Sequence, residues 1–170
     1  MFLVLGRKIA ESIKRANPNE TASVEVMSYS LTNIIHSSTI ILISLLISLP
    51  LNIFAETLLA LFWFMCLRVL TGGFHFKSLN VCATFSIISV VLCPYIAQIQ
   101  FLFPWVDYLS ITLLLVFSPA QNKSSVPDKW LKMISLLAVA LNMFLFQSDS
   151  ASIAIFIVSA LTIRKGVKRT

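Results

Sequence analysis

One segment of the sequence brings together the side chains that a thiol nucleophile requires. Residues 68–82 contain an arginine, two adjacent glycines, a histidine and a lysine, and the segment ends at Cys82. A cysteine attacks acyl carbons as its thiolate, which is scarce at neutral pH unless a base or a positive potential assists. His75 can take the thiol proton. The residue types therefore indicate a Cys82–His75 pair for acyl chemistry.

Two features favour a negative charge on the Cys82 sulfur. We expect Cys82 in the first turn of a helix, where unpaired backbone N–H groups and the helix dipole attract anions. Arg68 and Lys77 would add to this positive field. The spacing sets a condition, however, because seven residues of one continuous helix would hold His75 and Cys82 about 10 Å apart.

The chain must therefore fold back between the two groups. Gly72 and Gly73 permit the unusual backbone angles of such a turn. Ser78 or Asn80 can cap the helix that restarts after it. The same residues also have a purely structural interpretation, since a histidine and a cysteine seven positions apart are common by chance.

Other polar residues inside the apolar runs are expected to bond helices together, among them Ser86 and Asn142. His36 is interpreted as an interfacial structural residue. Glu56 stands near one end of an apolar run, at a depth where an acid suggests a partner or a wet cavity. We expect a structural use for it as well.

The cysteines do not indicate a metal site or a disulfide framework. Cys66, Cys82 and Cys93 form no Cys-x-x-Cys pair and no ladder with histidine at zinc spacing. We therefore expect neither a metal nor an organic cofactor.

The composition indicates a membrane protein. Of 170 residues, 58% are hydrophobic and 12% are charged, and the mean hydropathy is +0.90, whereas soluble domains are about half apolar. The net charge of +6 does not point to nucleic acid, because the basic residues fall in short clusters between apolar runs. That pattern sets orientation in a bilayer.

Six apolar runs predict about six transmembrane helices, at residues 31–49, 53–67, 81–98, 101–117, 131–146 and 151–163. Before them, Leu5, Ile9 and Ile13 lie one turn apart, which is typical of an amphipathic helix on the membrane surface; Pro18 breaks it. We predict an all-α integral membrane protein with a single domain over residues 1–170. It comprises an interfacial segment (1–30), a transmembrane bundle (31–163) and a basic tail (164–170).

The distribution of charge predicts the orientation. If the N-terminus is cytoplasmic, all thirteen basic residues fall in the inner segments 1–30, 68–80, 118–132 and 164–170. The outer turns near 50, 99 and 148 contain none. Short loops rich in lysine and arginine stay inside, so both termini are expected to be cytoplasmic. No removable signal peptide is expected, because the apolar start is only Met1 to Leu5.

The chain resembles the accessory gene regulator B (AgrB) family, membrane-embedded cysteine endopeptidases of bacterial quorum sensing. The resemblance covers nearly the whole chain. It includes the motif Arg-x4-Gly-x-His-x6-Cys at Arg68, Gly73, His75 and Cys82, and a later loop, Ser118-Pro119-Ala120-x-Asn122-Lys123, followed by Pro127. Phe74 and Phe76 around the histidine depart from the pattern.

The resemblance implies removal of the C-terminal tail of a short amphipathic precursor peptide (AgrD) on the cytoplasmic side of the bacterial cell membrane. Cys82 would be the nucleophile and His75 the base, forming a thioester that a thiol or hydroxyl of the peptide displaces to close a thiolactone or lactone. The supporting or substrate-binding residues would be Arg68, Gly72, Gly73, Lys77, Ser78, Asn122 and Lys123. Arg68 would bind the acidic tail of the precursor or support the loop. A homodimer is also implied as possible.

Two other functions stay open at this level. Glu56 and the polar residues in the crossings suggest a small-peptide transporter without protease activity, although they do not mark a midplane site on paired broken helices. A non-catalytic membrane interaction partner is the third hypothesis.

Overall fold

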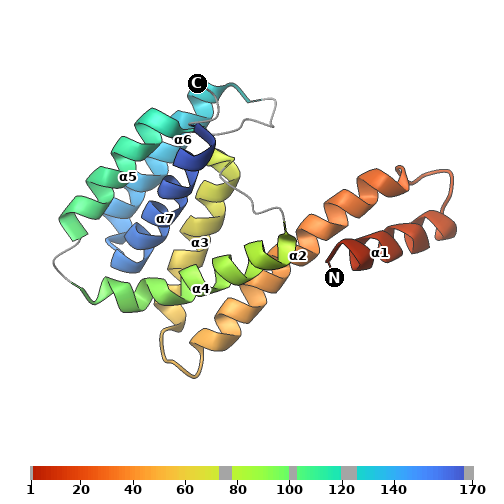
Figure 1. The fold of residues 1–170 in the computed structure, drawn as a ribbon, viewed down its shortest axis with the longest axis horizontal. Helices are drawn as coiled ribbons and strands as arrows, with labels where there is room; N and C mark the ends of the chain where they lie inside the picture. Colours follow the sequence, from red (N-terminus) through yellow and green to blue (C-terminus); the bar gives the residue numbers. More distant parts are fainter. Residues whose placement is uncertain (1, 73–77, 100–102, 120–125, 167–170) are drawn as a thin grey trace. The chain divides into compact units, whose positions relative to one another are not determined.

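The computed structural model of the protein describes residues 2–72, 78–99, 103–119 and 126–166. Within these residues all regular secondary structure is helical. The elements are α1 (Phe2–Ala16), α2 (Val24–Ser48), α3 (Phe54–Thr71), α4 (Leu79–Ala97), α5 (Phe103–Phe117), α6 (Asp128–Leu141), the π-helix η2 (Asn142–Phe146) and α7 (Asp149–Gly166) (Figure 1). This confirms the predicted all-α class.

Four helical segments are long and apolar enough to cross a membrane: Val24–Ser48, Phe54–Thr71, Leu79–Ala97 and Asp128–Phe146. Two shorter apolar helices, Trp105–Phe117 and Asp149–Ile163, match the remaining predicted crossings. A full crossing takes about 20 residues of helix, and both of these helices are shorter than that. The described part of the chain therefore fits a membrane protein.

Local sequence explains most helix ends. α1 stops at Asn17-Pro18, and Pro127 stands immediately before α6, where its fixed φ angle and missing N–H are tolerated. Gly72 ends α3 in the left-handed conformation, with a φ of 58°. α3 extends to Thr71, beyond the predicted end at Leu67, because the chain stays helical and buried through Arg68.

The chain divides into two compact units. The first comprises Met1–Ile43 and Phe76–Ile87, and the second comprises Ser44–His75 and Ile88–Thr170. α2 and α4 each contribute to both. The prediction of one domain over the whole chain stays a prediction.

In the first unit, α1 folds back along the first half of α2 (Figure 1). Phe2, Gly6 and Ala10, spaced one turn apart, form its buried side. The apolar residues Leu5, Ile9 and Ile13 remain exposed beside this contact. α1 is thus amphipathic, as predicted. The side that packs on α2 differs from the exposed apolar side formed by Leu5, Ile9 and Ile13.

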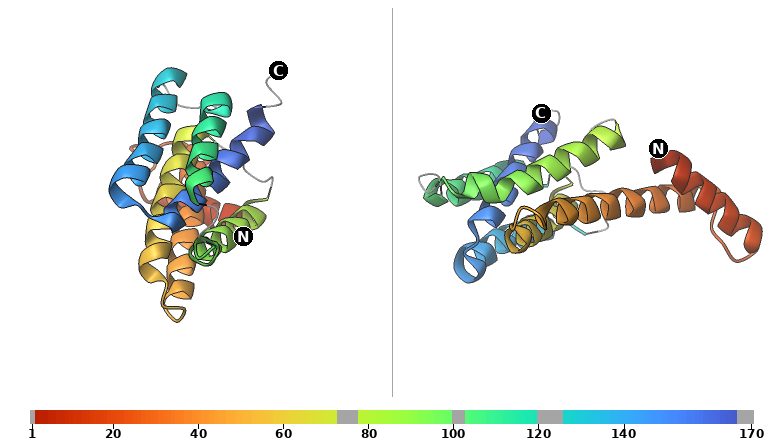
Figure 2. Two further views of the ribbon diagram at one scale, coloured as in Figure 1. Left: turned by 90° about the vertical axis from the view of Figure 1, so that its left-hand side faces the viewer. Right: turned by 90° about the horizontal axis from the view of Figure 1, so that it is seen from below.

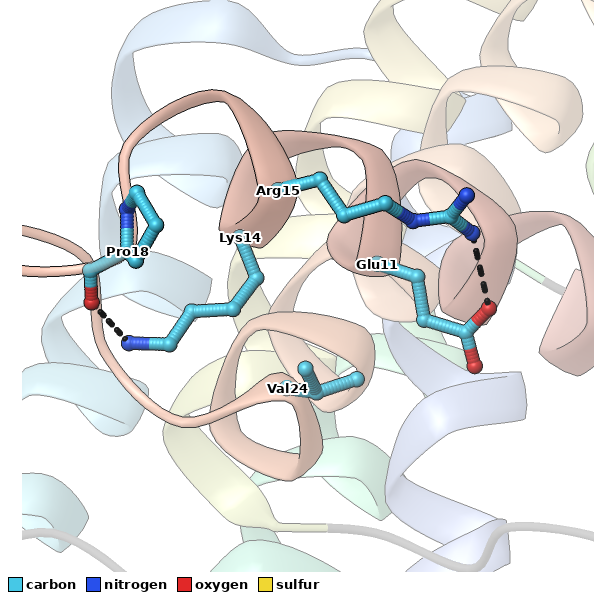
Figure 3. A pocket seen from close by; sticks show the side chains of 5 residues that line it. All are labelled: Glu11, Lys14, Arg15, Pro18 and Val24. Atoms are coloured by element: carbon cyan, nitrogen blue, oxygen red, sulfur yellow. Dashed lines mark hydrogen bonds and ion pairs between the residues drawn. The ribbon is translucent and has the colours of Figure 1, made fainter.

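The turn from α1 to α2 is tied by Lys14. Its Nζ donates hydrogen bonds to the carbonyl oxygens of Pro18 (2.7 Å) and Thr21 (2.8 Å). Glu11 and Arg15 form an ion pair at 3.8 Å beside it. An open pocket of about 510 Å³ lies beside this turn (Figure 3). It is lined by Glu11, Lys14, Arg15, Pro18 and Val24. A single lysine thereby pairs with two carbonyl groups of the turn that follows α1.

In the second unit, α7 and α6 each pack against both α3 and α5 (Figure 2). Trp63 of α3 meets Phe146 of η2 edge to face, with 5.7 Å between ring centroids. Buried Asn142 donates from Nδ2 to the Ser152 hydroxyl at 2.9 Å and to the Ser148 carbonyl at 3.3 Å. The predicted role of Asn142 as a residue that bonds helices together is confirmed.

Candidate active site

Arg68 lies in the last turn of α3 and not in a loop. Only 8% of it is exposed, and its guanidinium carbon stands 5.5 Å from the centroid of the Phe64 ring. A cation over an aromatic face is stabilising, especially where water is excluded. Arg68, the first residue of the motif, therefore makes a structural contact within α3.

The C-terminal end of α3 explains why Gly72 follows Thr71. The Thr71 hydroxyl donates to the Leu67 carbonyl at 2.8 Å, and Gly72 then takes the left-handed conformation that turns the chain out of the helix. Gly72 thus has the unusual backbone angles expected of it, and a side chain at that φ would be strained. The fold-back of the chain between His75 and Cys82 stays a prediction. Gly73, His75 and Lys77 lie outside the described residues, as do Asn122 and Lys123 of the later loop.

Cys82 lies in the first turn of α4, where the sequence predicted it. Its backbone N–H donates to the Ser78 carbonyl at 3.0 Å, so Ser78 occupies the capping position ahead of the helix. Asn80 is inside the helix and does not cap it. The amides of the residues before Cys82 have no partner four residues back within the helix, which gives this end its positive potential.

Cys82 is fully buried. It shares one face of α4 with Ala83 and Ser86, which are also buried, while Asn80, Val81 and Thr84 are exposed on the other side. Ala83 belongs to a core cluster with Phe2 and Ile40. The sulfur of Cys82 is therefore enclosed by this packed face.

Sequence reasoning missed one contact of this turn. His36 of α2 is buried, and its Nε2 lies 3.1 Å from the carbonyl oxygen of Leu79, the first residue of α4. Spacing gives no signal for a contact between residues 43 positions apart. His36 thus has a structural contact, and the structure shows which turn it contacts. Its interfacial structural role stays a prediction.

Glu56 is exposed in the first turn of α3. A carboxylate is stabilised there by the helix dipole. The structural use expected for Glu56 stays a prediction.

The described residues contain no group of three or more His, Cys, Asp or Glu side chains that could hold a metal ion.

Comparison with known families decides the relationship. A family model described as accessory gene regulator B matches residues 7–164. The chain belongs to the accessory gene regulator B family. This AgrB protein thereby has a role in agr quorum sensing, with a peptide precursor as its partner in a membrane setting. A search of curated proteins and a search of solved structures each found no match.

Proposed function

We propose that this AgrB protein is a cysteine endopeptidase that removes the C-terminal tail of a short AgrD-like precursor peptide. One observation carries the proposal: the motif Arg-x4-Gly-x-His-x6-Cys occurs in a chain of this family, and its cysteine stands in the first turn of α4. A helix N-terminus stabilises a thiolate. The alternative roles of this cysteine, a disulfide or a metal ligand, have no support in the described residues.

The proposed reaction has two steps. His75 accepts the Cys82 proton, the sulfur bonds to the scissile carbonyl carbon, and the C–N bond breaks as His75 returns the proton to the leaving amine. The tail departs and a thioester remains. His75 then accepts the proton of a thiol or hydroxyl within the peptide, whose sulfur or oxygen bonds to the same carbon. The bond from that carbon to the Cys82 sulfur breaks, which releases Cys82 as its thiolate and closes a thiolactone or lactone ring.

The burial of Cys82 fits this chemistry in one respect. Ring closure competes with hydrolysis, and a sulfur that water cannot reach protects the thioester. An amphipathic peptide held at the membrane would enter along the surface and displace part of the packing over the first turn of α4. Holding the two reacting groups of one peptide together also raises their effective concentration.

We also propose the location and orientation of the enzyme. The enzyme lies in the bacterial cell membrane with both termini and the motif on the cytoplasmic side. All lysine and arginine residues fall in the segments that this orientation places inside, which supports it. A homodimer is part of the same proposal.

The experiment compares cysteine variants of the reconstituted protein with a synthetic precursor peptide. Cys82→Ser should abolish tail removal, because a serine hydroxyl is a far weaker nucleophile at neutral pH. Cys93→Ser is the matched control, since Cys93 is equally buried in the same helix. A covalent peptide adduct should form in the wild type and be absent from the Cys82 variant.

Normal cleavage by Cys82→Ser would contradict the proposal. Equal loss of activity in both serine variants would also contradict it, since the effect would then come from packing. A transporter of small peptides would tolerate the Cys82 change and form no adduct.

A further inference from the structure

His36 makes a long-range hydrogen bond to the backbone of the turn that carries Cys82. Its Nε2 lies 3.1 Å from the Leu79 carbonyl oxygen. A carbonyl oxygen only accepts, so the imidazole is the donor and Nε2 carries the proton. The contact joins α2 to the first residue of α4 across 43 positions of sequence.

The ring of His36 is itself held in place. Phe2 of α1 meets it edge to face, with 5.4 Å between the ring centroids and an angle of 81°. Only 8% of His36 is exposed. An aromatic contact of this geometry fixes the plane of the imidazole, so the direction of the Nε2–H bond is set by α1 as well as by α2.

The accepting carbonyl belongs to the same helical turn as the cysteine. Residues three and four positions apart lie on one side of a helix, which places Leu79, Cys82 and Ala83 on one face of α4. That face is the packed one, because Cys82 and Ala83 are buried. All of these residues, with Phe2 and His36, belong to the first compact unit.

We propose that His36 is a positioning residue that holds the first turn of α4, and with it the Cys82 sulfur, in the orientation required for attack. The proposal rests on the proposed function for its kinetic consequence. The chain of contacts runs from Phe2 through the His36 ring to Leu79 and then one turn along α4 to Cys82. His36 touches neither the sulfur nor the peptide in this scheme.

The expected effect is on the reaction step and not on peptide binding. A nucleophile displaced by a fraction of an ångström to about 1 Å loses between about tenfold and about a hundredfold in rate. Loss of the anchor should therefore lower kcat within that range and leave KM nearly unchanged, because the peptide-binding surface is intact.

Three variants separate the hydrogen bond from packing and from proton transfer. His36→Phe keeps a flat ring against Phe2 and removes the donor. His36→Gln retains an N–H donor of similar reach but cannot act as a base near neutral pH. Thr39→Val is the matched control on the same helix, because the Thr39 hydroxyl donates only to its own helix, at the Ile35 carbonyl (2.8 Å).

The first readout does not depend on protease activity. Amide hydrogen exchange of a peptide covering the first turns of α4 should accelerate in His36→Phe and stay at the wild-type rate in His36→Gln and Thr39→Val. The rate of Cys82 alkylation, followed by mass spectrometry of its peptide, should change in the same variant alone. These results would stand even if the protein did not cleave the precursor.

The second readout is kinetic. In His36→Phe kcat should fall by between about tenfold and about a hundredfold. In His36→Gln kcat should stay close to the wild-type value. If His36→Gln is as inactive as His36→Phe while its exchange and alkylation are normal, His36 acts as a base and the positioning role is wrong. If His36→Phe leaves exchange, alkylation and kcat at wild-type values, the hydrogen bond does not position Cys82.

Discussion

Gly6 of α1 lies directly against Thr32 of α2. A β-carbon on Gly6 would stand 2.3 Å from the Thr32 Oγ1 atom and 3.0 Å from the Thr32 backbone nitrogen. The two helices therefore approach as closely as they do because position 6 has no side chain. Small residues at such crossings let helix backbones come into contact in membrane proteins.

Gly6→Ala should consequently push α1 away from α2. Overpacking of this kind costs about 1–3 kcal/mol, which should appear as a lower midpoint of thermal unfolding in detergent. Ser12→Ala, at an exposed position of the same helix, is the control and should change little. Adding Thr32→Ala should recover part of the loss, because it removes the nearest atom; an unchanged midpoint in Gly6→Ala would show that α1 does not dock in this way.

Arg68 is the residue whose two expected roles the structure helps to separate. Its buried guanidinium over the Phe64 ring favours support of the α3 end. Arg68→Lys should lose the planar contact and destabilise the protein by about 0.5–2 kcal/mol, with KM for the precursor unchanged. The measurement pairs thermal unfolding with peptide kinetics, and the exposed Arg7→Lys serves as control.

A different outcome would favour recognition of the acidic tail by Arg68. In that case Arg68→Lys would raise KM for a precursor with an acidic tail, leave KM for a neutral-tailed peptide unchanged, and have no effect on the unfolding midpoint.

Asn142 and Ser152 should be energetically coupled. The amide and the hydroxyl are both buried and lie 2.9 Å apart. Removing either partner leaves a buried polar group unsatisfied, at a cost of about 1–3 kcal/mol. Asn142→Ala, Ser152→Ala and the double variant, compared by chemical unfolding in micelles, should show that the double change costs less than the sum of the single ones. Strict additivity would contradict the contact.

Local sequence patterns predicted most of the helices, because an apolar run and the helix-breaking residues beside it determine where a helix begins and ends. The start of α4 follows from the change at about residue 80 from a polar segment to an apolar run, and this change places Cys82 in the first turn of the helix. The sequence predicts one continuous helix over 131–146, whereas the structure has a π-helical turn at Asn142–Phe146. The apolar residues of this turn do not distinguish π-helical from α-helical hydrogen bonding.

The contacts between helices were beyond such patterns. Nothing near His36 in sequence indicates that its partner is the Leu79 carbonyl, and nothing near Gly6 indicates Thr32. Arg68 was assigned to a loop because a charge ended the apolar run, whereas burial over Phe64 lets the helix continue through it. The pairing of His75 with Cys82 stays a prediction, because His75 lies outside the described residues.

The proposed orientation can be tested by labelling single cysteines introduced at exposed positions of a cysteine-free variant. Asn52 and Gln147 lie in turns expected outside, and Glu20 and Lys129 lie in segments expected inside; all four are exposed. In intact cells a membrane-impermeant maleimide should label the first pair and reach the second pair only after permeabilisation. The reverse pattern would place the motif on the outer face of the membrane, where a cytoplasmic precursor could not reach it, and would contradict the proposed orientation.

His75→Ala should leave the protein inserted but inactive. Without the imidazole no base accepts the Cys82 proton, so less of the reactive thiolate forms. The rate of Cys82 alkylation at neutral pH should then fall below that of the wild type. His36→Gln is the matched control, because it removes the other histidine of the chain and should leave the alkylation rate unchanged. Cleavage at the wild-type rate by His75→Ala would show that another group takes the proton, and an unchanged alkylation rate would show that His75 does not act on the sulfur.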